Sequence, residues 1–440
     1  MNLGRTIFGI CVIAFAACTA RAETYSLVEA PREGACFRIK TETQLAGTLT
    51  VTREGKSAPL KIVAKNEHAF VERIIAADRL VAKKTVRHYQ SAVSHATVDG
   101  EKADRELARD RRLIVAQRAG DLLLCYSPTS PLTRSDLEVV SEHFETLHLT
   151  GLLPNKDVAI GDSWKLESIT AQSLCLFDGL VSHELVARLK EVNAGVAVIA
   201  IEGTAKGIEN GALANLAIAA TVRFDLTRKQ IANVEWKQKD VRDQGPVSPA
   251  ADLEIMSTLT REPVETAPTE LSDAIVTGLP QTDEPAATLR HLVHRDGKGR
   301  YQFLHSRDWH VVGQTDYHLV LRLLDRGDFV AQATVTPWTN AGAGKHISPE
   351  DFEKLTAGGS NWKMEQVTDR TSVPTDADRW AYRVSAQGML DGNQVVQNFY
   401  VMANANGDQI VVTFTMRPAS VARLGTRDLE LLNAIDFLKK

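Results

Sequence analysis

Cysteine is scarce in this chain of 440 residues, and the few cysteines present are widely spaced. Two of the five lie within the first 22 residues, and the others are Cys36, Cys125 and Cys175. No pair has the C-x-x-C spacing, which excludes a zinc ribbon and a thioredoxin-type redox motif. We expect three buried apolar thiols, although one disulfide among them, of undetermined pairing, stays open for an exported protein.

Aromatic residues, basic residues and long apolar runs are also limited. Aromatics make up 6% of the chain, whereas carbohydrate binders usually present several exposed rings, so that function is disfavoured. The formal net charge is −4, without the basic excess that nucleic-acid binding requires. Beyond the N-terminal segment, no stretch is apolar enough to span a bilayer, so we expect no transmembrane segment in the mature chain.

The usual signatures of catalysis are missing as well. There is no G-x-S-x-G nucleophile elbow, and the Gly-Lys-Gly sequence at 297–299 is too short for a phosphate-binding P-loop. Cys125 falls in a predicted strand, where a buried thiol would be inert. We therefore assign no catalytic or cofactor-binding residue and expect a protein that is not an enzyme.

What the chain does contain begins with an export signal. Arg5 gives a basic start, residues 7–17 form a short apolar run, and residues 20–22 (ARA) form an A-x-A cleavage site. We expect cleavage after Ala22 and an exported bacterial protein, periplasmic or secreted. The alternative is a lipoprotein, because the preceding FAAC sequence resembles a lipobox that would make Cys18 the lipidated N-terminus.

The N-terminal half, residues 23–262, shows the period-two alternation of strands with one buried face. Hairpins are predicted between 48–52 and 60–64, and between 185–189 and 196–201. The clearest strand is 216–226, in which six apolar residues alternate with other residues, and its return strand begins at Ile231. The pattern predicts antiparallel β structure in this half.

Helix starts and a linker interrupt the strands. Ser135 and Glu138 have the spacing of a capping box, which predicts a helix beginning there. Ser348, followed by proline and two acids, predicts a second helix start. Residues 263–287 are rich in Pro, Glu, Thr and Asp, a composition that predicts a linker between two domains.

The C-terminal part, residues 288–440, combines strands with segregated helices. An aromatic strand opens it, three strands are predicted between 380 and 416, and apolar spacing over 429–437 predicts a closing amphipathic helix. Strands with segregated helices indicate an α+β sandwich. We therefore expect the α+β class.

Two resemblances rest on these residues. The opening strand with Tyr301, Phe303 and Trp309, the mid-domain helix, and the segments GDQIVVTFTMRP and LELLNAIDFLKK resemble the superfamily of the photosystem II protein PsbP and the periplasmic protein DcrB. This resemblance implies an α-β-α sandwich around an antiparallel sheet. The phrase LLPNKDVAIGDSW at 152–164 is similar to uncharacterised exported bacterial β-rich proteins. That likeness implies a curved antiparallel sheet or incomplete barrel, with Val158, Ile160 and Trp164 buried.

Histidines form the densest group of candidate metal ligands. Five fall within 28 residues: His291, His294, His305, His310 and His318. Zinc or copper needs three or four converging ligands, but strand alternation places His291 and His294 on opposite faces and the others on separate strands and loops. We expect scattered surface histidines and no bound metal.

These absences favour a binding protein over an enzyme. We expect a non-enzymatic binding or interaction protein of the bacterial envelope, whose unknown partner is another envelope protein or a lipid. The alternative is a carrier of a lipid or small hydrophobic ligand through the N-terminal sheet, and a hydrolase without a recognised motif is the third hypothesis. The shape of the first domain, a filled core or an open cavity, bears on the carrier hypothesis.

Overall fold

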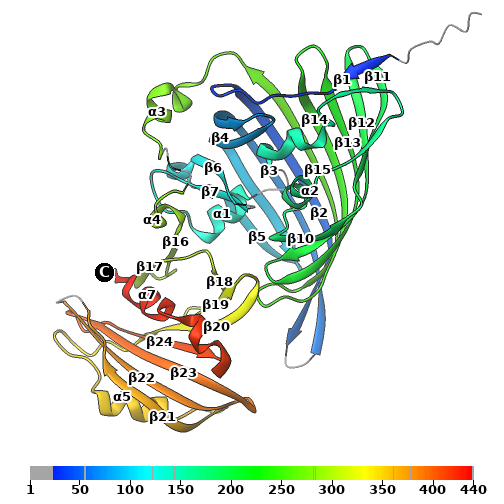
Figure 1. Cartoon of the computed structure of the whole chain (residues 1–440). Coiled ribbons are helices and arrows are strands. Elements are labelled where there is room, and N and C mark those ends of the chain that lie inside the picture. Colours follow the sequence, from blue (N-terminus) through cyan, green and yellow to red (C-terminus); the bar gives the residue numbers. More distant parts are fainter. Residues whose placement is uncertain are drawn as a thin grey trace, which may run out of the picture.

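The computed structural model describes residues 23–53, 56–120, 122–141, 145–280, 282, 284–359, 361–375 and 378–438. Strands predominate in this part of the chain, and they form antiparallel sheets of two, thirteen, three and seven strands (Figure 1). The predicted signal peptide, with its cleavage site after Ala22 and the lipobox at Cys18, lies outside the described residues. No helix of the described residues has the length and apolar character needed to cross a membrane.

The thirteen-stranded sheet contains most of the N-terminal half. Its strand order is β7-β6-β4-β3-β2-β15-β14-β13-β12-β11-β9, with β5 paired to β4 and β10 paired to β12. The strands are β2 (Cys36–Arg53), β3 (Lys56–Asp78), β4 (Val81–Val98), β5 (Glu101–Glu106), β6 (Leu113–Ala119), β7 (Leu122–Tyr126), β9 (Ser163–Lys165), β10 (Gly179–His183), β11 (Val186–Asn193), β12 (Val196–Glu209), β13 (Ala212–Asp225), β14 (Gln230–Arg242) and β15 (Ala250–Val264). A separate pair joins β1 (Thr24–Ser26) to β8 (Asp157–Ala159).

Alternation of side chains between the two faces explains this sheet. In β13, Leu216, Ile218 and Ala220 are buried, and the residues between them are exposed or half-buried. The three hairpins predicted from the sequence are present, with Leu49 opposite Leu60 and Phe224 opposite Ile231. The period-two pattern therefore predicted these pairs correctly.

Short helical segments fill the concave face of the curved sheet (Figure 1). They are α1 (Arg134–Val140), the 3-10 segment η2 (Thr146–Leu152) and α2 (Ser168–Leu174). Leu137, Leu149 and Leu174 from these segments are buried in one core with the inward residues of the strands. Where these segments cover it, the concave face thus holds a packed core.

The C-terminal part contains the remaining two sheets. The three-stranded sheet has the order β16-β17-β25, and the seven-stranded sheet has the order β18-β19-β20-β24-β23-β22-β21. Their strands are β16 (Leu292–Arg295), β17 (Tyr301–His305), β18 (Trp309–Gln314), β19 (Leu319–Asp325), β20 (Asp328–Trp338), β21 (Trp362–Ser372), β22 (Arg379–Leu390), β23 (Asn393–Asn404), β24 (Gln409–Met416) and β25 (Ile435–Phe437). Helix α5 (Pro349–Thr356) packs on one face of the larger sheet, and α6 (Val421–Leu424) and α7 (Arg427–Asn433) pack on the other.

The expected α+β class, with an α-β-α sandwich at the C-terminus, is wrong. The three C-terminal helices have eight, four and seven residues, which is too short to build layers over a seven-stranded sheet. The predicted closing helix also ends at Asn433, and Ile435 to Phe437 instead form β25 against β17. The described chain is mostly β and is built from large antiparallel sheets.

Two local predictions need correction and one is confirmed. The capping box of α1 begins at Thr133, two residues earlier than predicted. The Thr133 hydroxyl accepts from the backbone N–H of Asp136, and the Asp136 carboxylate accepts from the backbone N–H of Thr133. Ile160, just after β8, is 53% exposed, so its predicted burial is wrong, whereas Val158 is buried and Trp164 is half-buried. Ser348 does cap α5, since its hydroxyl accepts from the backbone N–H of Asp351.

The three cysteines of the described chain are all buried thiols, as expected, and they form no disulfide there. Burial raises the pKa of the Cys36 thiol, and it raises that of Cys175 to about 12. A thiol with a raised pKa is a poor nucleophile at neutral pH. These cysteines are therefore structural.

Two leucines of the predicted linker anchor it to the first sheet, although most of its described residues are exposed. Leu271, in η3 (Thr269–Leu271), and Leu279 are buried in a cluster with Val86 and Tyr126. The guanidinium of Arg73 donates to the carbonyl of Leu271 at 2.7 Å. We therefore expect these contacts to protect the segment as far as Leu279 from proteases.

We expect brief treatment with proteinase K to cut first between Pro280 and Ala286 and to leave two β-rich fragments. Mass spectrometry of the products identifies the bond that is cut. Cleavage that begins within 263–279 would show that this packing does not protect the segment. A chain that resists cleavage throughout would contradict the two-domain division.

Candidate functional site

The candidate functional site is a cavity of about 510 Å³ between the two halves of the chain. Its walls come from the end of β6, from α1 and α2, from the hairpin joining β12 to β13, from residues 247–248 and from residues 307–311. The polar residues of its lining form a basic group, a central ion pair and an acidic group. A volume of this size, with converging polar side chains, is typical of a small-molecule site.

Direct contacts between the halves hold the cavity walls in place. Val293 donates its backbone N–H to the carbonyl of Leu132 at 2.9 Å. The side chain of Arg322 on β19 donates to the carbonyl of Pro246. The hairpin turns at Gly211 and Gly327 also touch, and a side-chain carbon added to Gly211 would collide with the carbonyl of Gly327.

The basic group consists of Arg134, Arg307 and His310. Arg134 begins α1 and donates to the carbonyls of Arg307 and Trp309 at 3.1 and 3.0 Å. Arg307 donates to the carbonyls of Arg290 and Cys125 at 2.7 and 2.6 Å. Among the described residues, neither arginine has a carboxylate within ion-pair distance, and the Nε of Arg134 is buried without a hydrogen-bond partner.

Burial and like charges shift the pKa values of this group downward. Burial, with the charges of Arg134 and Arg290, lowers the pKa of Arg307 to about 10. Burial also lowers the pKa of Arg134, and Glu138 opposes the shift only in part, since its carboxylate binds Arg105 at 3.0 Å. The pKa of His310 falls to about 4 for the same two reasons, burial and Arg134. At neutral pH, two uncompensated arginine charges therefore line the cavity.

A buried ion pair occupies the centre of the lining. Arg118, at the end of β6, donates to both oxygens of Glu145 at 2.9 and 2.8 Å and to the hydroxyl of Ser173. The side chain of Arg118 is 9% exposed, and its Nη2 has no partner among the described residues. Because Glu145 neutralises Arg118, this pair adds an open donor to the cavity but little net charge.

The acidic group consists of Asp178 and Glu209, with Asp240 behind them. Asp178 accepts from the backbone N–H of Asn210 at 2.6 Å. Glu209 accepts from Arg242 at 2.7 Å, and the same guanidinium binds Asp240 at 2.9 Å. Arg242 thus pairs with two of the three carboxylates, Glu209 and Asp240. Burial above all, and then Asp240 and Asp178, raise the pKa of Glu209 to about 7 against the opposing effect of Arg242.

Three of the five candidate histidines are neighbours, since burial above all, with smaller effects of His294 and His291, lowers the pKa of His305 to about 4. His305 is 3% exposed, so its predicted surface position is wrong, and His294 lies against the rings of Tyr301 and Phe303. His310 lines the cavity, and His318 is exposed. No group of three or more potential metal ligands occurs in the described ranges, and the absence of a bound metal stays a prediction.

Sequence reasoning missed every charged residue of the cavity lining. Arg118, Glu209 and Arg307 come from distant segments, and no spacing motif connects them. The one available signal was the isolated charge at the end of an otherwise apolar strand, as at Arg118 after LIVAQ. That signal does not show which charged residues lie close together in the folded chain.

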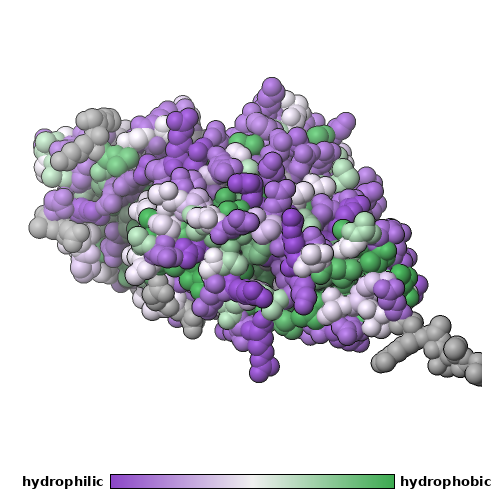
Figure 2. Space-filling view, turned by 90° about the horizontal axis from the view of Figure 1, so that it is seen from above, coloured by the Kyte–Doolittle hydropathy of each residue, from purple (hydrophilic) through white to green (hydrophobic). Residues whose placement is uncertain are grey.

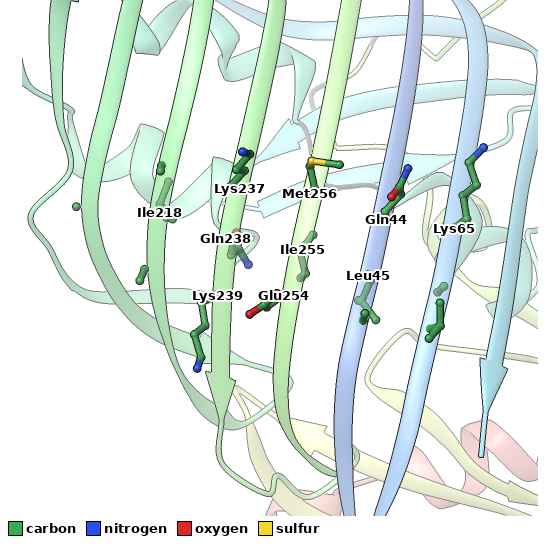
Figure 3. Close-up of a pocket in the computed structure, with 16 residues that line it drawn as sticks. Gln44, Leu45, Lys65, Ile218, Lys237, Gln238, Lys239, Glu254, Ile255 and Met256 are labelled. Carbon is green, nitrogen blue, oxygen red and sulfur yellow. The ribbon is translucent and has the colours of Figure 1, made fainter. Parts of the chain in front are cut away.

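A second concavity of about 780 Å³ lies on the opposite face of the large sheet. Figure 3 shows its lining on adjacent strands, with Lys237 on β14, Met256 on β15 and Lys65 on β3. These residues alternate with Ile218 and Ile255, which are buried on the core side, so the groove faces outward. On the face of the molecule seen from above, hydrophobic residues occur in patches among hydrophilic ones (Figure 2). The groove is more open than the interdomain cavity, so the interdomain cavity is the better candidate.

Comparisons with known proteins identify no family. No family model matches the chain, and no curated protein matches it. The structure of PsbP from Synechocystis sp. PCC 6803 matches with 14% identity and a TM-score of 0.27, over 34% of this chain and 92% of that one. The Ran-binding protein Mog1p of Saccharomyces cerevisiae matches with 11% identity and a TM-score of 0.25, over 33% of this chain and 95% of that one. Lipovitellin matches with 8% identity and a TM-score of 0.32, over 54% of this chain and 26% of that one. The predicted PsbP resemblance thus has a partial counterpart among solved structures, and membership of that superfamily is not shown.

Proposed function

We propose that this chain is a non-enzymatic, exported binding protein that holds a small organic anion in the cavity between its two halves. The observation that carries the proposal is the basic group. Arg134 and Arg307 are half-buried in the cavity wall and donate to backbone carbonyls, and no carboxylate among the described residues forms an ion pair with either of them.

A charge that is withdrawn from water without a counter-ion is costly. Removing an ion from water costs several kcal/mol, on the order of magnitude found for buried pairs, unless an opposite charge compensates it. A carboxylate or phosphate in the cavity would supply that charge and would accept from the open donors of Arg134 and Arg118. The bound anion would then stabilise the arrangement of the two halves.

A purely structural role for the two arginines is the competing explanation. Both join the halves through backbone carbonyls, as Arg322 does at another point of the same junction. Arg322 does not line the cavity, so it is a matched control. The two explanations therefore make different predictions for ligand binding.

We expect at least one of acetate, succinate, phosphate and N-acetyl-trialanine to raise the thermal unfolding midpoint at low ionic strength and to saturate one site by calorimetry. Arg134→Gln and Arg307→Gln should each weaken that binding about tenfold or more, because a charge-assisted bond contributes about 1.5–3 kcal/mol. Arg322→Gln should weaken that binding clearly less, because it loosens the junction without removing a cation from the cavity lining.

The proposal fails if none of these anions stabilises the protein more than chloride at equal ionic strength. It also fails if all three variants bind like the original chain. Native mass spectrometry of the protein from its host adds a test of export. The mature chain should begin at Glu23, whereas an acylated Cys18 would establish the lipoprotein alternative.

A further inference from the structure

We infer that the ligand is a zwitterion, with an ammonium group as well as its anionic group, and that a short peptide with free termini is the chemical class that fits. This inference rests on the proposed function, since the basic group must hold the anionic end. It adds a role for the acidic group. Asp178 and Glu209 would receive the ammonium.

The first support is the composition of the acidic group. Asp178 and Glu209 line the cavity, with Asp240 behind them, and Arg242 is the one cation bonded to this group in the described chain. A second cation would balance the carboxylates. The hydroxyl of Ser248, also in the lining, is buried and has no partner in the described ranges, so it can accept a further N–H donor.

The second support is the separation of the two charged groups. The basic group belongs to α1 and residues 307–311, and the acidic group belongs to the turn after α2 and the β12–β13 hairpin. Arg118 and Glu145 also belong to the lining, and Glu145 neutralises Arg118, whose side chain is nine-tenths buried and whose Nη2 has no partner among the described residues. The cavity therefore offers a positive region, a hydrogen-bond donor and a negative region in one volume of about 510 Å³.

A peptide matches this arrangement better than a simple anion does. Its carboxylate would face Arg134 and Arg307, a backbone carbonyl would accept from Arg118, and its ammonium would face Glu209. A ligand of drug-like size fits cavities of roughly 300–1,000 Å³. A single inorganic anion would leave most of this volume, and the whole acidic group, unused.

The ionisation of Glu209 gives the binding a pH dependence. Arg242, Asp240 and Asp178 face this carboxyl, and burial and the two acids raise its pKa to about 7. The ammonium of a peptide loses its proton near about pH 8. Binding of a zwitterion should thus strengthen from pH 6 to pH 7.5, where both partners are charged.

The test is calorimetry of the full chain with trialanine, N-acetyl-trialanine and trialanine amide. We expect trialanine to bind at least tenfold more tightly than either blocked peptide at pH 7.5. Glu209→Gln should weaken trialanine tenfold or more and leave N-acetyl-trialanine unchanged. The glutamine can still accept from Arg242, and Glu235→Gln on the exposed face is the matched control.

A second readout concerns the ligand-free protein and tests whether Glu209 is buried as described. A raised pKa means that the folded state binds the extra proton, so stability should fall as pH rises from about 4.5 to about 7. Glu209→Gln should flatten that fall. If Glu209→Gln folds and its stability falls less between about pH 4.5 and about pH 7, the variant is suitable for the binding measurement.

The outcomes separate the two levels of the argument. If N-acetyl-trialanine binds as tightly as trialanine, the zwitterion inference is overturned and the anion site stands. If neither peptide binds and the simple anions also fail, the proposed function itself is overturned. Equal weakening by Glu209→Gln and Glu235→Gln would also refute the role given to the acidic group.

Discussion

Replacing Glu72 with alanine should lower the free energy of unfolding of the N-terminal sheet by about 3–5 kcal/mol, the usual cost of breaking a buried ion pair. Glu72 lies on β3 and accepts from Arg87 at 2.9 Å, from Thr85 at 3.1 Å and from Thr146 at 2.6 Å. Both charged side chains are 4% exposed. Burial lowers the pKa of Arg87, but nearby groups, the charge of Glu72 first among them, together outweigh this effect and hold the pKa above its usual value. The Glu72 variant would therefore leave a buried, charged arginine without its partner.

The measurement is the urea dependence of the unfolding transition, with Glu67→Ala as the control. Glu67 pairs with Lys65 on the same strand, but its side chain is 46% exposed, so its loss should cost within about 0.5 kcal/mol. Adding Arg87→Met to Glu72→Ala should recover part of the lost stability, because the isolated charge is then removed as well. Similar costs for the two single variants would show that water screens the Glu72 pair.

Gly211→Ala should loosen the junction between the halves and weaken binding at the cavity by about tenfold or more, the effect of misplacing walls that converge on one ligand. Gly211 has a φ of +78° and touches Gly327 of the opposing hairpin. An added methyl group would collide with the backbone of Gly327, so the two hairpins must separate. Hydrogen exchange should then rise around residues 326–328 and 246–248.

Gly195→Ala is the matched control for this variant. Gly195 has a φ of +80° in the same kind of hairpin turn, and an added methyl group would find its nearest atom at 3.8 Å, on Thr227. In both variants an alanine must adopt a positive φ, which costs about 1 kcal/mol or more. Only the alanine at 211 also collides with a residue of the other half of the chain. If the two variants show the same binding and the same exchange, the contact at Gly211 does not position the cavity.

The strands could be predicted from the sequence wherever one face is buried. The alternation of apolar and other residues over 216–226 predicts both the strand and its buried face. Residues spaced two apart cannot lie on one face of a helix, so the pattern excludes a helix. The C-terminal class could not be predicted in this way. The apolar spacing of Leu429, Leu432, Ile435 and Phe437 fits a helix, but pairing with β17 turns the last two residues into a strand. Tertiary pairing, which leaves no local trace, decides such short segments.

The candidate site was beyond prediction for a related reason. His310 was considered as a metal ligand, yet in the structure it lies beside Arg134, from the other half of the chain. Whether a charge is compensated depends on neighbours that are remote in sequence. Arg118 has its carboxylate in Glu145, whereas no described carboxylate pairs with Arg307. Composition counts such charges but cannot show which of them are paired.

The pairing of β2 with β15 has a consequence for how the chain folds. It joins Thr43 to Ser257 across 214 residues and places the earliest and latest long strands of the sheet side by side. Contacts of such sequence separation slow folding, because the loop between them must close before the contacts form. The strands from β2 to β4 can form hairpins early, but β2 keeps an open edge until residue 264 is available. A newly made chain thus passes through a stage with an unpaired strand edge, which is the stage most exposed to aggregation.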